Sequence, residues 1–133
     1  MRVDARLLDA RRVEVTITND AAAPVVVNHR LAPGYRASSS REVFVEVFDG
    51  ERQVAAQAMD YDRHPPQRDD YAELAPGATL STEIDLPYWY RLPGPGDYEL
   101  VAHYQADEPL ALEVPGLVRG TFASARVPLP WRP

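Results

Sequence analysis

The chain has 133 residues, of which 45% are hydrophobic and 26% are charged. This length fits one domain, and the composition supports a packed core rather than a disordered chain. The net charge of -6 is opposite in sign to that of a surface that binds nucleic acid or anionic lipid, so neither is expected as a partner. Because the sequence has no cysteine and no lysine, it excludes a disulfide framework, a thiolate nucleophile and a lysine Schiff base.

The N-terminus carries charged residues at the place where a signal peptide would have its apolar core. Arg2, Asp4 and Arg6 fall within the first six positions. No stretch of the chain approaches the roughly 18 apolar residues that a membrane span requires. We therefore expect a cytoplasmic protein.

Apolar residues in the first half of the chain mostly recur at every second position. Residues 13–17 alternate in this way, as a half-buried strand does, and residues 25–27 form a short β-branched run. Residues 42–48 are apolar on both faces, which predicts a strand in the centre of a sheet. Asp49 and Gly50 then give the strongest hairpin signal in the chain, and it predicts a return strand from Arg52 to Met59.

The same period resumes after an aperiodic stretch at residues 60–70. Residues 80–86 alternate until Pro87, and residues 98–104 alternate after a crossover rich in proline and glycine. In the tail, the alternation predicts four inward side chains. These are Ala123, Ala125, Val127 and Leu129.

This pattern predicts seven or eight short strands and no long helix. It indicates an all-β fold in which residues 1–133 form a single immunoglobulin-like antiparallel β-sandwich. The segment from Pro95 to Leu100 resembles the tyrosine corner of such sandwiches. We therefore expect Tyr98 to be buried, with its hydroxyl bonded to backbone upstream.

The order of these segments from Val13 to Tyr104 resembles two families. One is the bacterial intracellular proteinase inhibitor (BsuPI-like) domain, and the other is the accessory domain of deuterolysin-type metalloproteases. The shared features are, in order, a first strand ending at Asn19 and Asp20, the hairpin, the long loop, the Leu74–Gly77 turn, the strand at residues 84–86 and the turn at residues 96–98. The resemblance implies a noncatalytic module, and the His-Glu-x-x-His zinc motif of the peptidase is missing from the sequence.

The sequence gives no pattern of catalytic or metal-binding residues. His29, His64 and His103 are far apart, and we expect His103 to lie on the solvent face of its strand. The acidic residues between Asp60 and Asp70 lack the glycine and the ligand spacing of a calcium loop. No Gly-x-Ser-x-Gly motif provides a serine nucleophile. We therefore predict no enzyme activity, no catalytic residues, no metal and no cofactor.

Two segments could bind a ligand or a partner. The first is the aperiodic loop, which two adjacent prolines should stiffen before a protein partner docks on it. Its candidate contact residues are Tyr61, Arg63, His64, Pro65, Pro66, Gln67 and Arg68. The second is the aromatic crossover Tyr88, Trp89 and Tyr90, which could bind a carbohydrate or another small ligand. The alternatives are a surface loop without a role and rings that plug one end of the sandwich.

Overall fold

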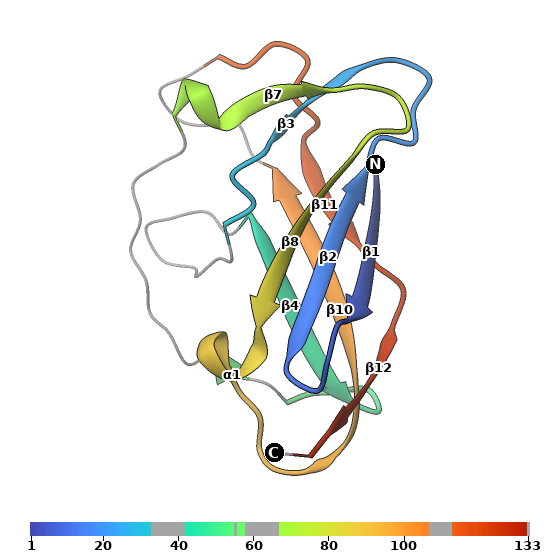
Figure 1. The fold of residues 1–133 in the computed structure, drawn as a ribbon, viewed down its shortest axis with the longest axis vertical. Coiled ribbons are helices and arrows are strands. Elements are labelled where there is room, and N and C mark those ends of the chain that lie inside the picture. The colour runs from blue at the N-terminus through green and yellow to red at the C-terminus, as the bar shows by residue number, and fades with distance from the viewer. Residues whose placement is uncertain (33–41, 55, 58–66, 107–112, 133) are drawn as a thin grey trace.

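A computed structural model describes residues 1–32, 42–54, 56–57, 67–106 and 113–132, and its fold is all-β, as the sequence predicts (Figure 1). All of its strand ladders are antiparallel. The strands are β1 (Arg2–Leu7), β2 (Arg12–Thr18), β3 (Val25–Asn28), β4 (Val43–Asp49), β5 (Arg52–Gln53), β6 (Ala56–Gln57), β7 (Tyr71–Leu74), β8 (Thr79–Asp85), β9 (Tyr90–Arg91), β10 (Gly96–Ala106), β11 (Gly120–Ala123) and β12 (Val127–Trp131). Two single helical turns, η1 (Arg68–Asp70) and α1 (Leu86–Trp89), complete the described elements.

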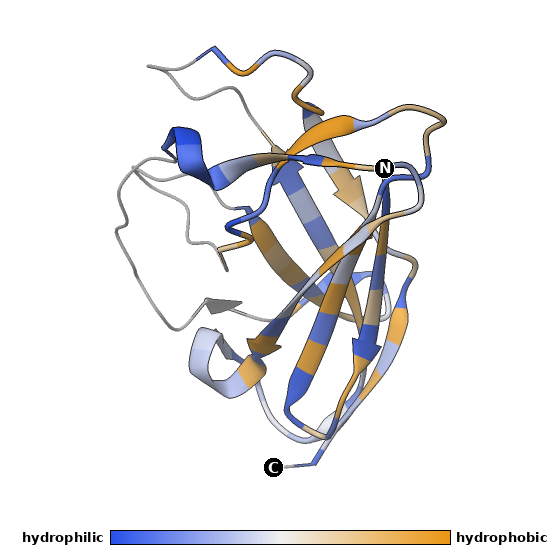
Figure 2. Cartoon of the chain, turned by 45° about the horizontal axis from the view of Figure 1, so that its top comes forward, coloured by the Kyte–Doolittle hydropathy of each residue, from blue (hydrophilic) through white to orange (hydrophobic). Residues whose placement is uncertain are grey.

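Two sheets share one hydrophobic core. The first has the order β1-β2-β8, and the second has the order β11-β10-β4-β5, with β12 also paired to β10. Apolar and polar residues alternate along β2 and β8, so that each strand turns one face to the core and one to solvent (Figure 2). Val15 and Ile84 from the first sheet and Val47 and Leu100 from the second all have exposed fractions of 1% or less.

Two shorter ladders connect the ends of the main sheets. Strand β3 pairs with β7 at one end of the molecule, and β6 pairs with β9 near the other (Figure 1). The predicted Leu74–Gly77 turn joins β7 to β8, and Gly77 adopts a positive φ of 77° there, which glycine tolerates without strain.

The tyrosine corner is confirmed. Tyr98 is 8% exposed, and its hydroxyl donates a hydrogen bond of 2.7 Å to the carbonyl oxygen of Gly94, four residues upstream. The ring lies so close to Gly96 that a Cβ atom at this position would be 3.1 Å from the ring carbon Cζ. Glycine at position 96 therefore makes room for the corner.

The hairpin after β4 forms, but its turn and its return strand differ from the prediction. Asp49 pairs with Arg52, so the turn consists of Gly50 and Glu51 rather than Asp49 and Gly50. The return strand β5 pairs with β4 at Arg52 and Gln53, and one more bond runs from the Val54 amide to the Val47 carbonyl, whereas β6 pairs with β9 instead. Residues 55, 58 and 59 of the predicted strand lie outside the described residues. The reason is that the amide of Val45 donates a 3.0 Å hydrogen bond to the hydroxyl of Tyr90, a position that a longer return strand would need.

In the tail, the predicted inward positions of Ala123 and Ala125 are wrong, since both residues are exposed. Ala123 lies opposite His103 and Val127 lies opposite Leu100, so four steps along the tail match three steps along β10. This extra residue acts as a bulge and reverses the alternation. The tail therefore turns Val127 and Leu129 inward, as predicted.

Strand β1 and helical turn α1 are among the elements that the sequence analysis did not predict. Strand β1 pairs with β2 along its whole length and buries Val3, although its charged residues suggested only the lack of a signal peptide. Helical turn α1 begins after Asp85, whose side chain accepts a hydrogen bond of 3.3 Å from the amide of Tyr88.

Candidate functional site

The predicted contact loop lies mostly outside the described residues. Tyr61, Arg63, His64, Pro65 and Pro66 are not described, whereas Gln67 and Arg68 are exposed at the start of η1.

The described end of that loop, residues 67–70, is held by internal hydrogen bonds. The amide of Gln67 donates to the Asp70 carboxylate at 2.7 Å, and the amide of Asp70 donates to the Gln67 carbonyl at 2.9 Å. This reciprocal pair gives the loop end one defined backbone conformation.

Residues 69 and 70 are also tied to the chain just after β3. The amide of His29 donates to the carbonyl oxygen of Asp70 at 2.8 Å, and the His29 ring nitrogen Nε2 lies 2.7 Å from the carbonyl oxygen of Asp69. Arg30 Nη1 lies 3.8 Å from a carboxylate oxygen of Asp70. The loop end is therefore fixed to the body of the protein.

A buried carboxylate, Glu42, lies at the centre of this region. Its side chain is 2% exposed, directly before β4, and Arg30 contacts it through Nη2 at 2.6 Å and through Nε at 2.9 Å and 3.0 Å. The Asn28 side-chain amide donates to it at 2.7 Å, and the backbone amide of Ala32 donates at 2.9 Å. Internal donors thus contact both carboxylate oxygens, and the hydrogen bond from Arg30 to Glu42 raises the pKa of Arg30.

The same cluster reaches the second sheet through Tyr104. The hydroxyl of Tyr104 accepts a hydrogen bond of 3.0 Å from the amide of Asn28, and burial raises the pKa of this hydroxyl to about 12. Burial also raises the pKa of Tyr71, at the start of β7. Residues of β3, β10 and η1, together with Arg30 after β3 and Glu42 before β4, therefore meet around one ion pair. We call this group the Glu42 cluster: Asn28, Arg30, Glu42, Asp70 and Tyr104.

The Glu42 cluster was not predicted from the sequence. Glu42 appeared there only as the first residue of an apolar strand, and Arg30 is twelve positions earlier in a segment without periodicity. A charged residue directly before a strand that is apolar on both faces was the available signal, because such a residue enters a buried environment and needs a partner.

The aromatic crossover is divided between core and surface. The hydroxyl of Tyr90 bonds to the Val45 amide, and the Tyr90 ring is 6% exposed. Trp89 is half-buried against the core, and Tyr88 is 55% exposed, with its ring at 80° to that of Trp89 and 5.1 Å away. Of the three rings, Tyr88 is the one that a ligand in solution could contact over most of its surface.

The two histidines among the described residues have different surroundings. His103 lies on the outer face of β10, as expected, but its side chain is only 13% exposed because the ring stacks on Phe44 at 4.7 Å. Its Nε2 atom faces the carboxylate of Glu46. Within the described ranges, no three histidine, cysteine or acidic side chains come together in a group that could hold a metal. Nor does this part of the chain contain a helix long and apolar enough to cross a membrane.

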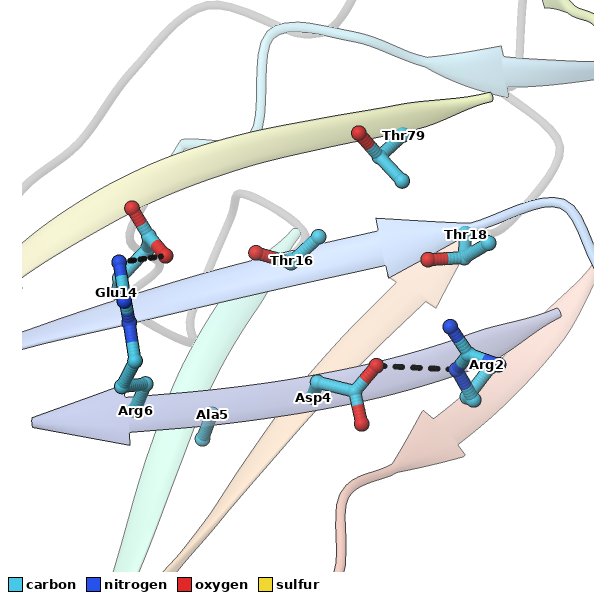
Figure 3. A pocket seen from close by; sticks show the side chains of 8 residues that line it. All are labelled: Arg2, Asp4, Ala5, Arg6, Glu14, Thr16, Thr18 and Thr79. Carbon is cyan, nitrogen blue, oxygen red and sulfur yellow. Dashed lines mark hydrogen bonds and ion pairs between the residues drawn. The ribbon is translucent and has the colours of Figure 1, made fainter. Parts of the chain in front are cut away.

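A shallow hollow of about 250 Å³ lies on the outer face of the first sheet (Figure 3). Two arginines border it, and each pairs with a nearby carboxylate at 3.0 Å: Arg2 with Asp4, and Arg6 with Glu14. Because these charges compensate one another, the hollow does not favour an ion of either sign.

Comparison with known protein families gives no matching family, and no curated protein matches the chain.

Proposed function

We propose that this chain is a noncatalytic protein-binding module with an immunoglobulin-like sandwich, similar to the BsuPI-like inhibitor domain. The strand orders β1-β2-β8 and β11-β10-β4-β5 and the tyrosine corner support this architecture. The proposed partner is another protein, for which a bacterial serine protease is the first candidate, and the proposed location is the cytoplasm.

The observation that carries the proposal is the Glu42 cluster. A buried ion pair is weak evidence for stability, because removing both charges from water costs about as much as their attraction returns. The position of this ion pair is what matters here. Glu42 and Arg30 hold the chain after β3 against the start of β4, and Arg30 also faces Asp70 at the end of the loop. An end of the molecule that is fixed in this way loses little conformational entropy when a partner docks on it.

The proposed contact residues include two members of the fixed loop end and five that precede it: Tyr61, Arg63, His64, Pro65, Pro66, Gln67 and Arg68. Arginine is common among the residues that dominate protein interfaces, so Arg63 and Arg68 are the first positions to change. The module would bind through this segment while the Glu42 cluster keeps its described end in place.

The test is inhibition of a panel of bacterial serine proteases by the chain and by an Arg63→Ala, Arg68→Ala double variant. We expect the double variant to inhibit at least about tenfold more weakly, which corresponds to 1.4 kcal/mol. Arg11→Ala is the control, because Arg11 is exposed next to the turn between β1 and β2. Equal inhibition by the double variant and the wild type would reject this contact segment, and a panel that the wild type leaves fully active would reject the protease as partner.

A second proposal is a small-ligand or carbohydrate-binding module that uses the aromatic crossover. The exposed ring of Tyr88 favours it, because sugars bind to exposed aromatic faces. Titration with a panel of sugars should then change the fluorescence of the adjacent Trp89, and Tyr88→Ala should abolish the change. A signal that persists in the Tyr88→Ala variant would exclude the crossover as the binding site.

A further inference from the structure

Strand β8 forms one border of the three-stranded sheet (Figure 1), so one row of its backbone groups points away from that sheet. Two hydrogen bonds at the ends of the β2-β8 ladder show which row this is: Leu86 donates to the Arg11 carbonyl at 2.9 Å, and Asn19 donates to the Ala78 carbonyl at 3.1 Å. Backbone direction alternates along a strand, so Leu80, Thr82 and Ile84 bond to β2. The N–H and C=O groups of the odd-numbered residues of β8 therefore point outward.

No other strand among the described residues pairs with this outer edge of β8. The side chains of its four odd-numbered residues are exposed as well. These residues are Thr79, Ser81, Glu83 and Asp85. The edge is seven residues long and contains no proline, glycine or bulge. It therefore presents a straight row of donors and acceptors of the kind that accepts another strand.

The opposite situation at β12 shows what a protected edge looks like in this protein. Pro128 and Pro130 lie opposite Glu99 and Asp97 of β10. Because proline has no N–H, the ladder to β10 must run through Val127, Leu129 and Trp131, and the two prolines occupy the outward positions. An added strand would find no donors at these positions. The second sheet is thus protected at β12, whereas β8 is not.

We propose that two copies of this chain associate through antiparallel pairing of β8 with β8. A two-fold axis at Thr82 would overlap all seven residues of the strand. Ser81 would then lie opposite Glu83 of the second copy, and Thr79 would lie opposite Asp85. Each carboxylate faces a hydroxyl that can donate to it, and no like charges are opposed.

The inner side of the strand is compatible with the same register. Leu80, which is only half-buried in the single chain, would lie opposite Ile84 of the second copy and extend the core across the pair. Sliding one copy by two residues toward Asp85 would place Glu83 opposite Glu83 of the second copy, and like charges in this position destabilise a sheet. Charge therefore disfavours sliding in this direction, and sliding by two residues in the other direction would leave only residues 79–83 paired.

This inference goes beyond the proposed function and does not depend on it. The proposed contact segment ends at Arg68, and none of its residues belongs to β8. A failure of either hypothesis leaves the other standing, because one is measured with a protease and the other with the chain alone.

The test is sedimentation equilibrium of the chain between about 10 μM and 1 mM, a range suited to the weak association expected of a single pair of edge strands. The apparent mass should rise from the 14.9 kDa of one chain toward twice that value. An apparent mass that stays at one chain over the whole range would overturn the proposal.

Three substitutions at Ser81 test the register. Each of them removes the 2.8 Å hydrogen bond between the hydroxyls of Ser81 and Thr16, so Ser81→Ala serves as the matched control. Relative to this control, Ser81→Lys should strengthen association by about fivefold or more, because it faces Glu83 of the second copy, and Ser81→Glu should weaken it by a similar factor. Equal dissociation constants for all three variants would overturn this register.

A proline variant tests the edge itself. Ser81→Pro removes an outward N–H that does not bond to β2, so it should abolish association while the far-UV spectrum stays that of the wild type. The control is Ala5→Pro in β1, where the hydrogen bond from Leu8 to the Arg12 carbonyl shows that the odd-numbered amides also point outward. Loss of association in Ala5→Pro but not in Ser81→Pro would assign the contact to β1 and reject the proposal. If the Ser81→Pro variant fails to fold, the dissociation constants of the Ser81→Lys and Ser81→Glu variants still show whether β8 is the contact.

Discussion

The hydroxyl of Tyr98 in β10 bonds back to the crossover that precedes this strand. The hydroxyl of Tyr98 is the donor to the Gly94 carbonyl, while its ring fills the space above Gly96. Tyr98→Phe keeps the ring and removes only this donor, so we expect a loss of about 1–2 kcal/mol in the free energy of unfolding. Urea denaturation measures this loss. Tyr88→Phe is the control because the Tyr88 ring is exposed, and equal midpoints for both variants would contradict the role of the corner.

In the Glu42 cluster, removing one charge of the ion pair should destabilise the fold more than removing both charges. Arg30→Met leaves the buried Glu42 carboxylate without its cation, which should cost about 3–5 kcal/mol of unfolding free energy. Adding Glu42→Gln removes the uncompensated charge and keeps an oxygen that can accept from the Ala32 amide. The double variant should therefore be more stable than Arg30→Met alone in urea denaturation. A double variant that is less stable than Arg30→Met would show that Glu42 does not depend on Arg30 for charge compensation.

Asp9, in the turn between β1 and β2, makes the stability of the fold depend on pH in the acidic range. Hydrogen bonds from the backbone amide of Arg11 and from the side chain and amide of Arg12 lower the pKa of Asp9 from 3.8 to about 2. Because the folded state holds the carboxylate in its charged form, this contribution is present above pH 3.8 and is lost as the pH falls toward about 2.

An Asp9→Asn variant cannot titrate at this position. Its melting temperature should therefore fall less between pH 4 and pH 2 than that of the wild type, as measured by circular dichroism. Parallel curves for the two proteins over this interval would show that Asp9 makes no contribution to the acid dependence.

At the scale of the elements, the edge of β4 depends on a side chain from another ladder. The Val45 amide bonds to the Tyr90 hydroxyl, at a place where β5 has already ended. Tyr90→Phe should increase the exchange rate of the Val45 amide hydrogen by about tenfold or more, because the amide loses its acceptor. The Val54 amide is the internal reference, since it donates to the Val47 carbonyl in the β4-β5 hairpin. Hydrogen exchange followed by NMR measures both sites, and an unchanged rate at Val45 would contradict this role.

The elements that the sequence predicts well are those in which one face is buried along the whole strand. Residues 13–17, 80–86 and 98–104 alternate because each strand has one side in the core and one in solvent. The tail fails because a single extra residue near Ser124 shifts the register, and the amide of Ala102 then bonds to the Ser124 hydroxyl at 2.9 Å. Alternation alone does not reveal such a bulge.

The candidate site was less predictable than the strands, for a different reason. Glu42 and Arg30 meet because β3 ends close to the place where β4 begins, and no local pattern encodes that meeting. Conversely, the tyrosine corner was visible because its donor, acceptor and the glycine between them all lie within five consecutive residues, from Gly94 to Tyr98. Contacts within a turn can be predicted from the sequence, whereas contacts between distant segments need the fold.

For the whole molecule, β12 completes the core although it comes last in the chain. Leu129 is fully buried, Trp131 is 8% exposed, and Val127 packs against the same core. Full burial of a large apolar side chain contributes about 1.5–3 kcal/mol, so Leu129 and Trp131 together contribute about 3–6 kcal/mol, to which the partly buried Val127 adds. This amount is comparable to the entire stability of a typical domain, which is about 5–15 kcal/mol.

A chain that ends at Arg126 should therefore lose cooperative unfolding, since it lacks β12 and leaves the Leu100 and Tyr98 side of β10 without its partner. Thermal denaturation monitored by near-UV circular dichroism should show no sharp transition for this truncated chain. The control is a chain that ends at Trp131, which loses only the exposed Arg132 and the final proline and should melt within a few degrees of the full chain. A cooperative transition of the shorter chain near the full-length melting temperature would show that the two sheets hold together without β12.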